Sequence, residues 1–451
     1  MSDRKHCGGW LGKRQFLLVP GRGLPHAVTR FQICAFKRGR DMPAHSTPPL
    51  GLRRSLGLWH VVLYGLGVTV GAGIYALVGA VVAQAGDYAP VSFLVAALVM
   101  VLPAACFAEL TGRMPFAAAE AHFVRAGFGV SWLFPVVGLM VAGVGVISAA
   151  AIAHGAVGYL AQLAGLPGAV LLFAVIACCT AVACLQVRQS VMLAGVLTLV
   201  EVGGLLLLVG GAAWSGADLV GQAARALPLS LSPALWAGVF GASLLAFFAF
   251  IGFEDIDSIA EETREPQKVL PRAIFLTLVL TSMLYILVII SALSVASRAE
   301  LSQSAAPLAL VFERSTGLSP LAITLIAVAA TVNGIVVQIL MAGRVIYGLA
   351  RQGALPAALG RVNPRTAAPV TATLVSGAGV LALALAFPIA ALAQGTSVVT
   401  LGVFVLVCVA LGRIKARREP APIGGFVVFG WVPWAGALAC ALLLVLAGWA
   451  A

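Results

Sequence analysis

Long runs of apolar residues, separated by short polar segments, follow one another along the chain from about residue 57 onward. An apolar run of about 18 or more residues can cross the hydrocarbon core of a bilayer as a helix. This pattern predicts an all-α integral membrane protein with about eleven transmembrane helices, and the connection 298–317 has room for a short extra helix. The predicted spans are 57–83, 90–112, 130–162, 168–187, 190–213, 234–260, 270–297, 318–350, 367–387, 389–412 and 424–450.

Lysine and arginine residues indicate the orientation of these spans, because cytoplasmic loops retain them. With the N-terminus placed in the cytoplasm, only three of the 28 Lys and Arg fall in outer loops, namely Arg225, Arg298 and Arg314. A wrong number of spans would have scrambled this asymmetry in all later loops. We therefore expect a multi-pass protein of the cytoplasmic membrane with a cytoplasmic N-terminus and, for an odd number of spans, a C-terminus outside.

Composition supports this interpretation, since 61% of the residues are hydrophobic and 10% are charged, whereas soluble proteins carry roughly 25% charged residues. Residues 1–54 are rich in Lys and Arg without a nucleic-acid-binding motif, so we expect a basic, disordered cytoplasmic tail and no nucleic acid partner. Residues 1–41 are expected to be either disordered or outside the functional chain. Residues 55–415 would form a core of ten helices, and residues 416–451 a cytoplasmic linker with one additional transmembrane helix.

The residue groupings that carry chemistry in enzymes, metalloproteins and channels are missing from the sequence. The eight cysteines show neither metal-ligand spacing nor a disulfide framework, so no metal and no cofactor is expected. A membrane-bound enzyme would place paired acids with histidine or metal ligands at a membrane face, and a channel would repeat a pore-lining filter. Neither pattern occurs, which disfavours both classes. The oligomeric state is not indicated.

Two spans are longer than the bilayer requires and carry glycine near their middles. The first has Gly71 and Gly73, and the sixth has Gly252, followed by the acids Glu254 and Asp255. Breaks in two spans that lie five apart are typical of the inverted repeats of secondary transporters. Glycine also permits close helix packing, which would be the simpler explanation for either span alone. The matched positions favour a five-plus-five inverted-repeat transporter fold with broken helices 1 and 6.

Breaks of this kind expose peptide groups that can bind a solute. An unwound Gly-Ala-Gly segment offers amide N–H groups at the positive end of a half-helix, where a carboxylate binds well. Unwound carbonyls at 248–251 suit an ammonium group. Non-helical backbone is tolerated inside a bilayer only where it is buried in protein or lines a cavity. The sequence therefore predicts a site for a small zwitterion between the two breaks.

Four stretches resemble amino acid permeases of the amino acid–polyamine–organocation superfamily. They are GVTVGAGIY (67–75), CFAELTGRMP (106–115), FFAFIGFEDIDSIAEETREPQKVLPRAI (247–274) and GRVIYGLARQGALP (343–356). The third stretch is the most specific, and together they occur in the family's order. The resemblance implies transport of amino acids by alternating access through a five-plus-five inverted repeat.

The resemblance also implies which positions contact the substrate. The carboxylate would meet the backbone of Val70, Gly71, Ala72, Gly73 and Ile74. The amino group would meet the carbonyls of Phe247, Phe248 and Ala249, the side-chain pocket would include Phe248, Phe250 and Ile251, and Gly252 would lie in the second break. Two features depart from the family. Relatives usually have twelve spans, and their loop after the second span often reads Gly-x-x-Tyr, where this chain has Glu120.

Acidic residues inside the spans are candidates for ion coupling. Glu201 stands alone among apolar residues of the fifth span, where some proton-driven relatives place a lysine. A buried carboxyl favours its protonated form, so we expect Glu201, with Glu254 as a second candidate, to carry a coupling proton. A protonated glutamate that only hydrogen-bonds a neighbouring helix is the alternative for Glu201, and stabilisation of a helix N-terminus is the alternative for Glu254.

Other polar residues in the spans are given structural roles. Glu109 is expected to cap its helix or to pair with Arg113 or Arg344, and Glu120 lies in an amphipathic cytoplasmic stretch. His154 is expected to pack between helices, with a proton relay as the alternative. Asn333 and Gln338 are expected to hydrogen-bond across helices, with substrate contact as the alternative.

These features together predict a secondary active transporter that takes up neutral amino acids with protons by symport. The named pocket side chains are apolar, which favours neutral substrates. Exchange of amino acids or polyamines remains an alternative, as does uptake of cationic amino acids if Glu201 or Glu254 faces the pocket. Sodium coupling is disfavoured because the hydroxyl clusters that such sites use are not evident in the sequence.

Overall fold

The computed structural model describes residues 55–114, 119–185, 191–230, 232–363, 368–421 and 424–449, and helices account for most of them. Within these ranges the only β-type pairing is an isolated bridge between Leu56 and Thr263. The expected tail 1–54 lies outside the described residues. The elements are α1 (Leu58–Val70), α2 (Ala72–Ala85), η1 (Gly86–Tyr88), α3 (Ala89–Arg113), α4 (Ala119–Phe128), α5 (Leu133–Ala164), α6 (Gly168–Cys184), α7 (Val191–Trp214), α8 (Leu219–Arg225), α9 (Pro233–Phe250), η2 (Phe253–Glu262), α10 (Pro266–Val295), α11 (Arg298–Gln303), α12 (Pro307–Thr316), α13 (Leu321–Arg351), η3 (Ala357–Gly360), α14 (Val370–Ala386), α15 (Ile389–Ala416) and α16 (Val432–Trp449).

The predicted all-α membrane fold is confirmed. Among the described residues, eight helical stretches are long and apolar enough to cross a membrane, and α1, α6 and α14 are shorter apolar helices. Each of the eleven predicted spans overlaps one of these apolar helices, except that the first overlaps both α1 and α2. The connection 298–317 holds two short helices, α11 and α12, where the sequence suggested room for one. The five-plus-five repeat itself stays a prediction.

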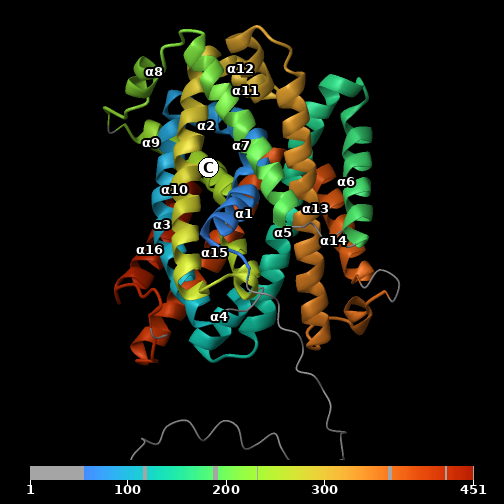
Figure 1. The fold of residues 1–451 in the computed structure, drawn as a ribbon, viewed down its shortest axis with the longest axis vertical. Helices are drawn as coiled ribbons and strands as arrows, with labels where there is room; N and C mark the ends of the chain where they lie inside the picture. Colours follow the sequence, from blue (N-terminus) through green and yellow to red (C-terminus); the bar gives the residue numbers. More distant parts are fainter. Residues whose placement is uncertain are drawn as a thin grey trace, which may run out of the picture. The chain divides into compact units, whose positions relative to one another are not determined.

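Both long spans are broken where the glycines lie. Helix α1 ends at Val70 and α2 begins at Ala72, with Gly71 between them at φ −49° and ψ −113°. Helix α9 ends at Phe250, and Ile251 is extended before the 3₁₀ helix η2 begins. Gly252 has φ +122°, a conformation that residues with a side chain rarely adopt. In Figure 1, α1 and α2, both blue, follow each other through the middle of the helix bundle.

The two ends of the bundle differ in the contacts that their charged side chains make. Figure 1 shows α4 at one end and α8, α11 and α12 at the other. At the α8 end, the ion pairs are exposed, such as Arg225 with Asp218 and Arg298 with Asp87. At the α4 end, Arg413 and Arg417 donate hydrogen bonds to carbonyls of α4, at Gly127 and Ala126. Arg413 and Arg417, which are both predicted to lie in an inward loop, are therefore at the α4 end.

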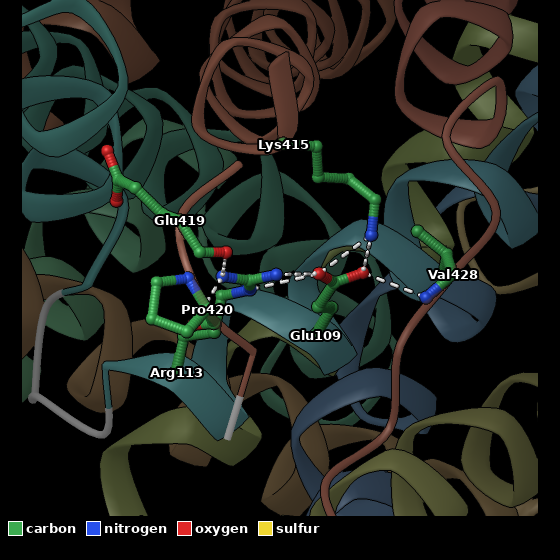
Figure 2. A network of polar contacts seen from close by, with 6 residues as sticks. All are labelled: Glu109, Arg113, Lys415, Glu419, Pro420 and Val428. Carbon is green, nitrogen blue, oxygen red and sulfur yellow. Dashed lines mark hydrogen bonds and ion pairs between the residues drawn. The ribbon is translucent and has the colours of Figure 1, made fainter. Parts of the chain in front are cut away.

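A buried carboxylate, that of Glu109, joins the end of α3 to the end of α15 (Figure 2). Arg113 Nη2 donates to Glu109 Oε1 at 2.7 Å, and Lys415 Nζ lies 2.7 Å from Oε2. The backbone N–H of Val428, in the segment before α16, donates to Oε2 at 2.8 Å. Arg113 also donates to the carbonyls of Glu419 and Pro420. Of the two expected partners of Glu109, Arg113 is confirmed, and Arg344 is replaced by Lys415.

Neutralising Glu109 is expected to destabilise the protein, because Arg113 and Lys415 would be left close together without a counter-charge. Removing one partner of a buried ion pair typically costs about 3–5 kcal/mol. We expect Glu109→Gln to lower the thermal unfolding temperature clearly, measured by tryptophan fluorescence in detergent. The matched control is Lys268→Gln, which breaks the exposed pair with Glu265 and should cost less than about 1 kcal/mol. Equal shifts in the two variants would contradict the assigned role of Glu109.

Candidate binding cavity

A cavity of about 740 Å³ lies beside the two breaks. Its walls come mainly from α1, α5, α7 and α13, with Phe248 and Ala249 at the end of α9 and Gly71 and Gly73 at the first break. Small-molecule sites typically have volumes of about 300–1,000 Å³. The cavity is therefore large enough for an amino acid and its water, and unwound backbone forms part of its wall.

The first break is packed closely on two sides. A side-chain carbon at Gly73 would lie 2.7 Å from the Cα of Ala249, so this glycine lets α2 cross the end of α9 in backbone contact. A side-chain carbon at Gly71 would lie 4.0 Å from Oε2 of Glu201 in α7. Gly73 thus serves helix packing, the alternative that the sequence left open, and it also lines the cavity. The two roles are compatible because Gly73 both contacts Ala249 and borders the cavity.

At the second break, backbone groups form hydrogen bonds with groups only two or three residues away. The N–H of Ile251 donates to the carbonyl of Phe248 at 3.2 Å, and the N–H of Asp255 donates to the carbonyl of Gly252 at 3.1 Å. The carboxylate of Glu254 accepts from the N–H of Gly252 at 2.9 Å. Glu254 therefore stabilises the start of η2, in agreement with the helix-terminus alternative. Asp255 is partly buried beside it.

One tyrosine links the two breaks. The hydroxyl of Tyr285, in α10, lies 2.8 Å from the carbonyl oxygen of Thr69 and 2.9 Å from that of Ala249. These carbonyls belong to the last turns of α1 and α9, where helical acceptors lack their usual partners. Tyr285 is fully buried, and its ring packs against Phe93 and Phe250. The side chain therefore satisfies backbone that the breaks expose and holds the two broken spans together.

Two further tyrosines position the wall of the cavity around Glu201. The hydroxyl of Tyr159 donates to the carbonyl of Tyr75 at 3.0 Å, and the hydroxyl of Tyr75 donates to the carbonyl of Glu201 at 2.9 Å. The side chain of Glu201 is only 3% exposed and lines the cavity. Its Oε2 has no hydrogen-bond partner among the described residues. A buried polar atom of this kind usually binds water or a ligand.

The charge in the cavity is sparse. Its lining includes the ionisable side chains of His122, Glu201, Glu262 and Arg344, besides a tyrosine. Burial and the neighbouring charge of Arg125 lower the pKa of His122 below its ordinary value, which favours the neutral imidazole. No group of His, Cys, Asp and Glu among the described residues is suited to hold a metal ion.

The cavity reaches one end of the protein. Its lining extends to His122 in α4 and to the exposed Arg344 and Gln352 at the end of α13. None of its described lining residues comes from α8, α11 or α12. At that far end, α11 lies directly on α2, since a side-chain carbon at Gly79 would be 2.7 Å from the carbonyl oxygen of Leu301. The binding region is therefore accessible from the α4 end and covered at the other.

The residues that the family resemblance implied fall into two groups. Those that line the cavity are Gly71, Gly73, Phe248, Ala249 and Ile251. Those that are buried in the described packing outside its lining are Val70, Ile74, Phe247, Phe250 and Gly252. The side chain of Ala72 lies outside the described residues, although its backbone begins α2. The side chain of Phe250 packs against Phe93 and Tyr285 rather than facing the cavity.

The other polar residues named from the sequence have identifiable positions in the structure. Nε2 of His154 lies 2.9 Å from the carbonyl oxygen of Ala384, so this side chain joins α5 to α14. Asn333 and Gln338 line the cavity. Glu120 is buried in the first turn of α4, and burial raises its pKa above the ordinary value of a glutamate.

Sequence reasoning missed Tyr285 and the hydroxyls that precede it. Thr277, Thr281 and Tyr285 recur every four residues and thus share one face of α10. That face meets α1, because a side-chain carbon at Gly65 would lie 2.7 Å from Oγ1 of Thr277 and because Tyr285 contacts Thr69. The i, i+4 spacing of hydroxyls in an otherwise apolar span was the available signal.

Comparisons with known proteins identify the family of the chain. Residues 56–450 match the amino acid permease family. The chain is 32% identical over 400 residues to cationic amino acid transporter 2, vacuolar, of Arabidopsis thaliana, covering 82% of this chain and 62% of the relative. It is 28% identical over 440 residues to the branched-chain amino acid permease BcaP of Bacillus subtilis, covering 91% of each. It is 26% identical to cationic amino acid transporter 4 of Mus musculus, covering 89% of this chain and 66% of the relative.

The plant relatives are longer than this chain, which spans between 62% and 64% of their lengths. The match to the family nevertheless covers almost every described residue, from the segment before α1 to the end of α16. It includes both breaks and the whole cavity lining. The chain therefore belongs to the amino acid permease family.

Proposed function

We propose that the protein is a secondary active transporter that moves amino acids across the cytoplasmic membrane by alternating access, with proton-coupled uptake of neutral amino acids as its main activity. The cavity beside the two helix breaks carries this proposal. It has residues of both helix breaks in its wall, and its described lining residues reach α4 but not α8, α11 or α12. Membership of a family whose relatives are named as amino acid transporters supports it. A catalytic role finds no support, since the relatives are transporters.

A zwitterionic substrate fits the polarity of the backbone around the cavity. The start of α2, from Gly71 to Gly73, presents N–H groups at the positive end of a helix dipole, which suits the carboxylate. The end of α9, from Phe247 to Ala249, places carbonyls at the negative end of its dipole, which suits the ammonium group. The carbonyls of Phe248 and Ala249 already accept one hydrogen bond each, from Ile251 and Tyr285, and each keeps a second lone pair. The side chain would then extend toward α5 and α13, which provide much of the remaining lining.

The position of Glu201 suggests how a proton is coupled to the substrate. Its Oε2 lies near Gly71, on the side of the break where the substrate carboxylate would bind. A charged Glu201 would repel that carboxylate in a region of low dielectric constant. A protonated Glu201 could instead donate a hydrogen bond to it. We infer that protonation of Glu201 precedes or accompanies substrate binding, which is the requirement for symport. Glu254 is the weaker candidate because its carboxylate already holds the N–H of Gly252.

Cationic amino acids are the second candidate substrates. Some relatives are named as cationic amino acid transporters and another as a branched-chain amino acid permease. The apolar lining residues Phe248, Ile251 and Ile152 favour a neutral side chain, whereas Glu201 would attract a cationic one. Exchange of amino acids or polyamines would use the same cavity without a proton gradient.

The end of the bundle that bears α4 is proposed to face the cytoplasm. Arg113, Arg413, Lys415 and Arg417 lie at that end, and cytoplasmic loops are enriched in Lys and Arg. The cavity described above would then be the inward-open form, ready to release substrate into the cell. A cytoplasmic N-terminus follows from the same assignment.

An amino acid that occupies the proposed site should stabilise the purified protein. Binding at a concentration 100-fold above Kd stabilises the native state by about 2.7 kcal/mol. We expect at least one of the twenty amino acids, screened by thermal unfolding, to raise the unfolding temperature. Its methyl ester and its N-acetyl form should not, because each lacks one of the two charges that the broken helices bind. Equal stabilisation by the methyl ester would contradict the carboxylate site at Gly71–Gly73.

Replacing Glu201 should separate substrate transport from the proton gradient. Gln keeps a hydrogen-bond donor but cannot titrate, so Glu201→Gln should bind substrate and exchange it across proteoliposomes while losing accumulation driven by a pH gradient. The control is Glu313→Gln, an exposed acid in α12, which should behave as the unmodified protein. Acid-stimulated accumulation that persists in Glu201→Gln would exclude Glu201 as the coupling residue.

A further inference from the structure

Helix α10 is longer than the hydrocarbon core of a bilayer. Its 30 residues, Pro266–Val295, would extend about 45 Å at a rise of about 1.5 Å per residue, against a core of about 30 Å. The helix, yellow in Figure 1, runs between the two ends of the bundle, and its C-terminal end leads into α11. Its first turns therefore extend beyond the hydrocarbon core at the α4 end, at the level of the lipid headgroups.

Three cationic residues gather where α10 begins. Lys268 and Arg272 are four residues apart and so share one face of the helix, and Arg264 lies just before it. All three residues are exposed, and we call them the basic patch. Lys268 pairs with Glu265, whereas the ion pairs of the described residues include neither Arg264 nor Arg272. The patch therefore keeps a net positive charge over these four residues.

The backbone that carries the basic patch is held in place. The N–H of Arg264 donates to the carbonyl of Leu56 at 2.9 Å, and the N–H of Lys268 begins the hydrogen bonding of α10. On the opposite face of α10, Thr281 and Tyr285 are fully buried against the bundle. The rotation of the helix is thus fixed, and the basic patch points away from the protein core.

An apolar strip continues the face of the basic patch into the membrane. Val279 and Met283 follow Arg272 by about two and three helical turns, which brings them to the same side of α10. Their exposed fractions are 53% and 58%, and Leu280 and Leu287 beside them are exposed as well. Because these side chains are exposed on a membrane-spanning helix, they contact the acyl chains of lipids.

Aromatic side chains indicate the depth of the basic patch in the membrane. The ring of Phe275, in the turn after Arg272, packs edge to face with Phe426. Phe429 and Trp431, shortly after Phe426 in the chain, are 75% and 62% exposed. Exposed tryptophan is typical of the boundary between the hydrocarbon core and the headgroups. The basic patch therefore lies at the boundary where phosphate groups of lipids are found.

We propose that the basic patch binds the phosphate of an anionic phospholipid, whose acyl chains lie along Val279 and Met283. The charge of the patch fits an anionic headgroup, and the apolar strip fits the chains that a soluble phosphate lacks. Arginine can donate two parallel hydrogen bonds to one phosphate, and Lys and Arg clusters beside a span attract anionic lipids. The bound lipid would brace the start of α10, together with the hydrogen bond from Arg264 to Leu56. The site is independent of the proposed transport function.

Lipid-dependent stability tests the site. Phosphatidylglycerol should raise the thermal unfolding temperature of the detergent-purified protein more than phosphatidylcholine does, because only the former has a net negative charge. Replacing all three residues of the basic patch by glutamine should remove most of this difference. A matched control removes the same charge from exposed positions away from α10 and should keep the difference: Arg351→Gln, Arg361→Gln and Arg418→Gln. Equal losses in the two triple variants, or no difference between the two lipids, would overturn the site.

Two further measurements distinguish a lipid from a soluble anion. Glycerol 3-phosphate carries the charge of the headgroup without acyl chains, so it should not stabilise the protein; stabilisation equal to that by phosphatidylglycerol would overturn the lipid assignment. Phosphatidylglycerol with a diazirine in its acyl chain should label residues 276–283 several-fold more than the matching phosphatidylcholine, measured by peptide mass spectrometry. Equal labelling would overturn the site. Thermal stabilisation by an amino acid should persist in both triple variants, so failure of the lipid site would leave the proposed function intact.

Discussion

A chain that leaves the helical conformation inside a bilayer must find partners for the peptide groups that it exposes, since lipid offers none. This constraint governs the protein at both breaks. The hydroxyl of Tyr285 approaches the carbonyls of Thr69 and Ala249, and the carboxylate of Glu254 takes the N–H of Gly252. Because these contacts use groups on both sides of the crossing, they fix how the broken spans meet. The location of the cavity follows from that crossing.

Much of the architecture could be predicted from the sequence because its causes are local. Apolar length predicts a span, a glycine in mid-membrane predicts a break, and the distribution of Lys and Arg predicts which loops share an end. The breaks at Gly71 and Gly252 appear where these rules placed them. The open cavity between them is consistent with the zwitterion site that the same glycines suggested.

The contacts that complete the site were beyond such reasoning, because they join residues that are distant in sequence. Glu109 pairs with Lys415 across 306 positions, and Tyr285 meets Thr69 across 216. A single sequence does not show which of its many Lys, Arg and hydroxyl side chains will contact a particular carboxylate or carbonyl in the fold. The dual role of Gly73 was hidden for the same reason, since its close approach to Ala249 depends on how two helices cross.

The backbone of Val428 completes the set of donors around Glu109, and the ring of Phe426, two residues earlier, packs edge to face with Phe275 of α10. The segment before α16 therefore helps to hold the ends of α3 and α10 in place. A truncated chain that ended after α15 would keep all ten core spans, yet it would strip a donor from a buried carboxylate and uncover an aromatic ring. Epitope tags or fluorescent fusions inserted between Arg418 and Val432 would disturb these contacts with Glu109 and Phe275. The connection between α8 and α9 is the better place for them.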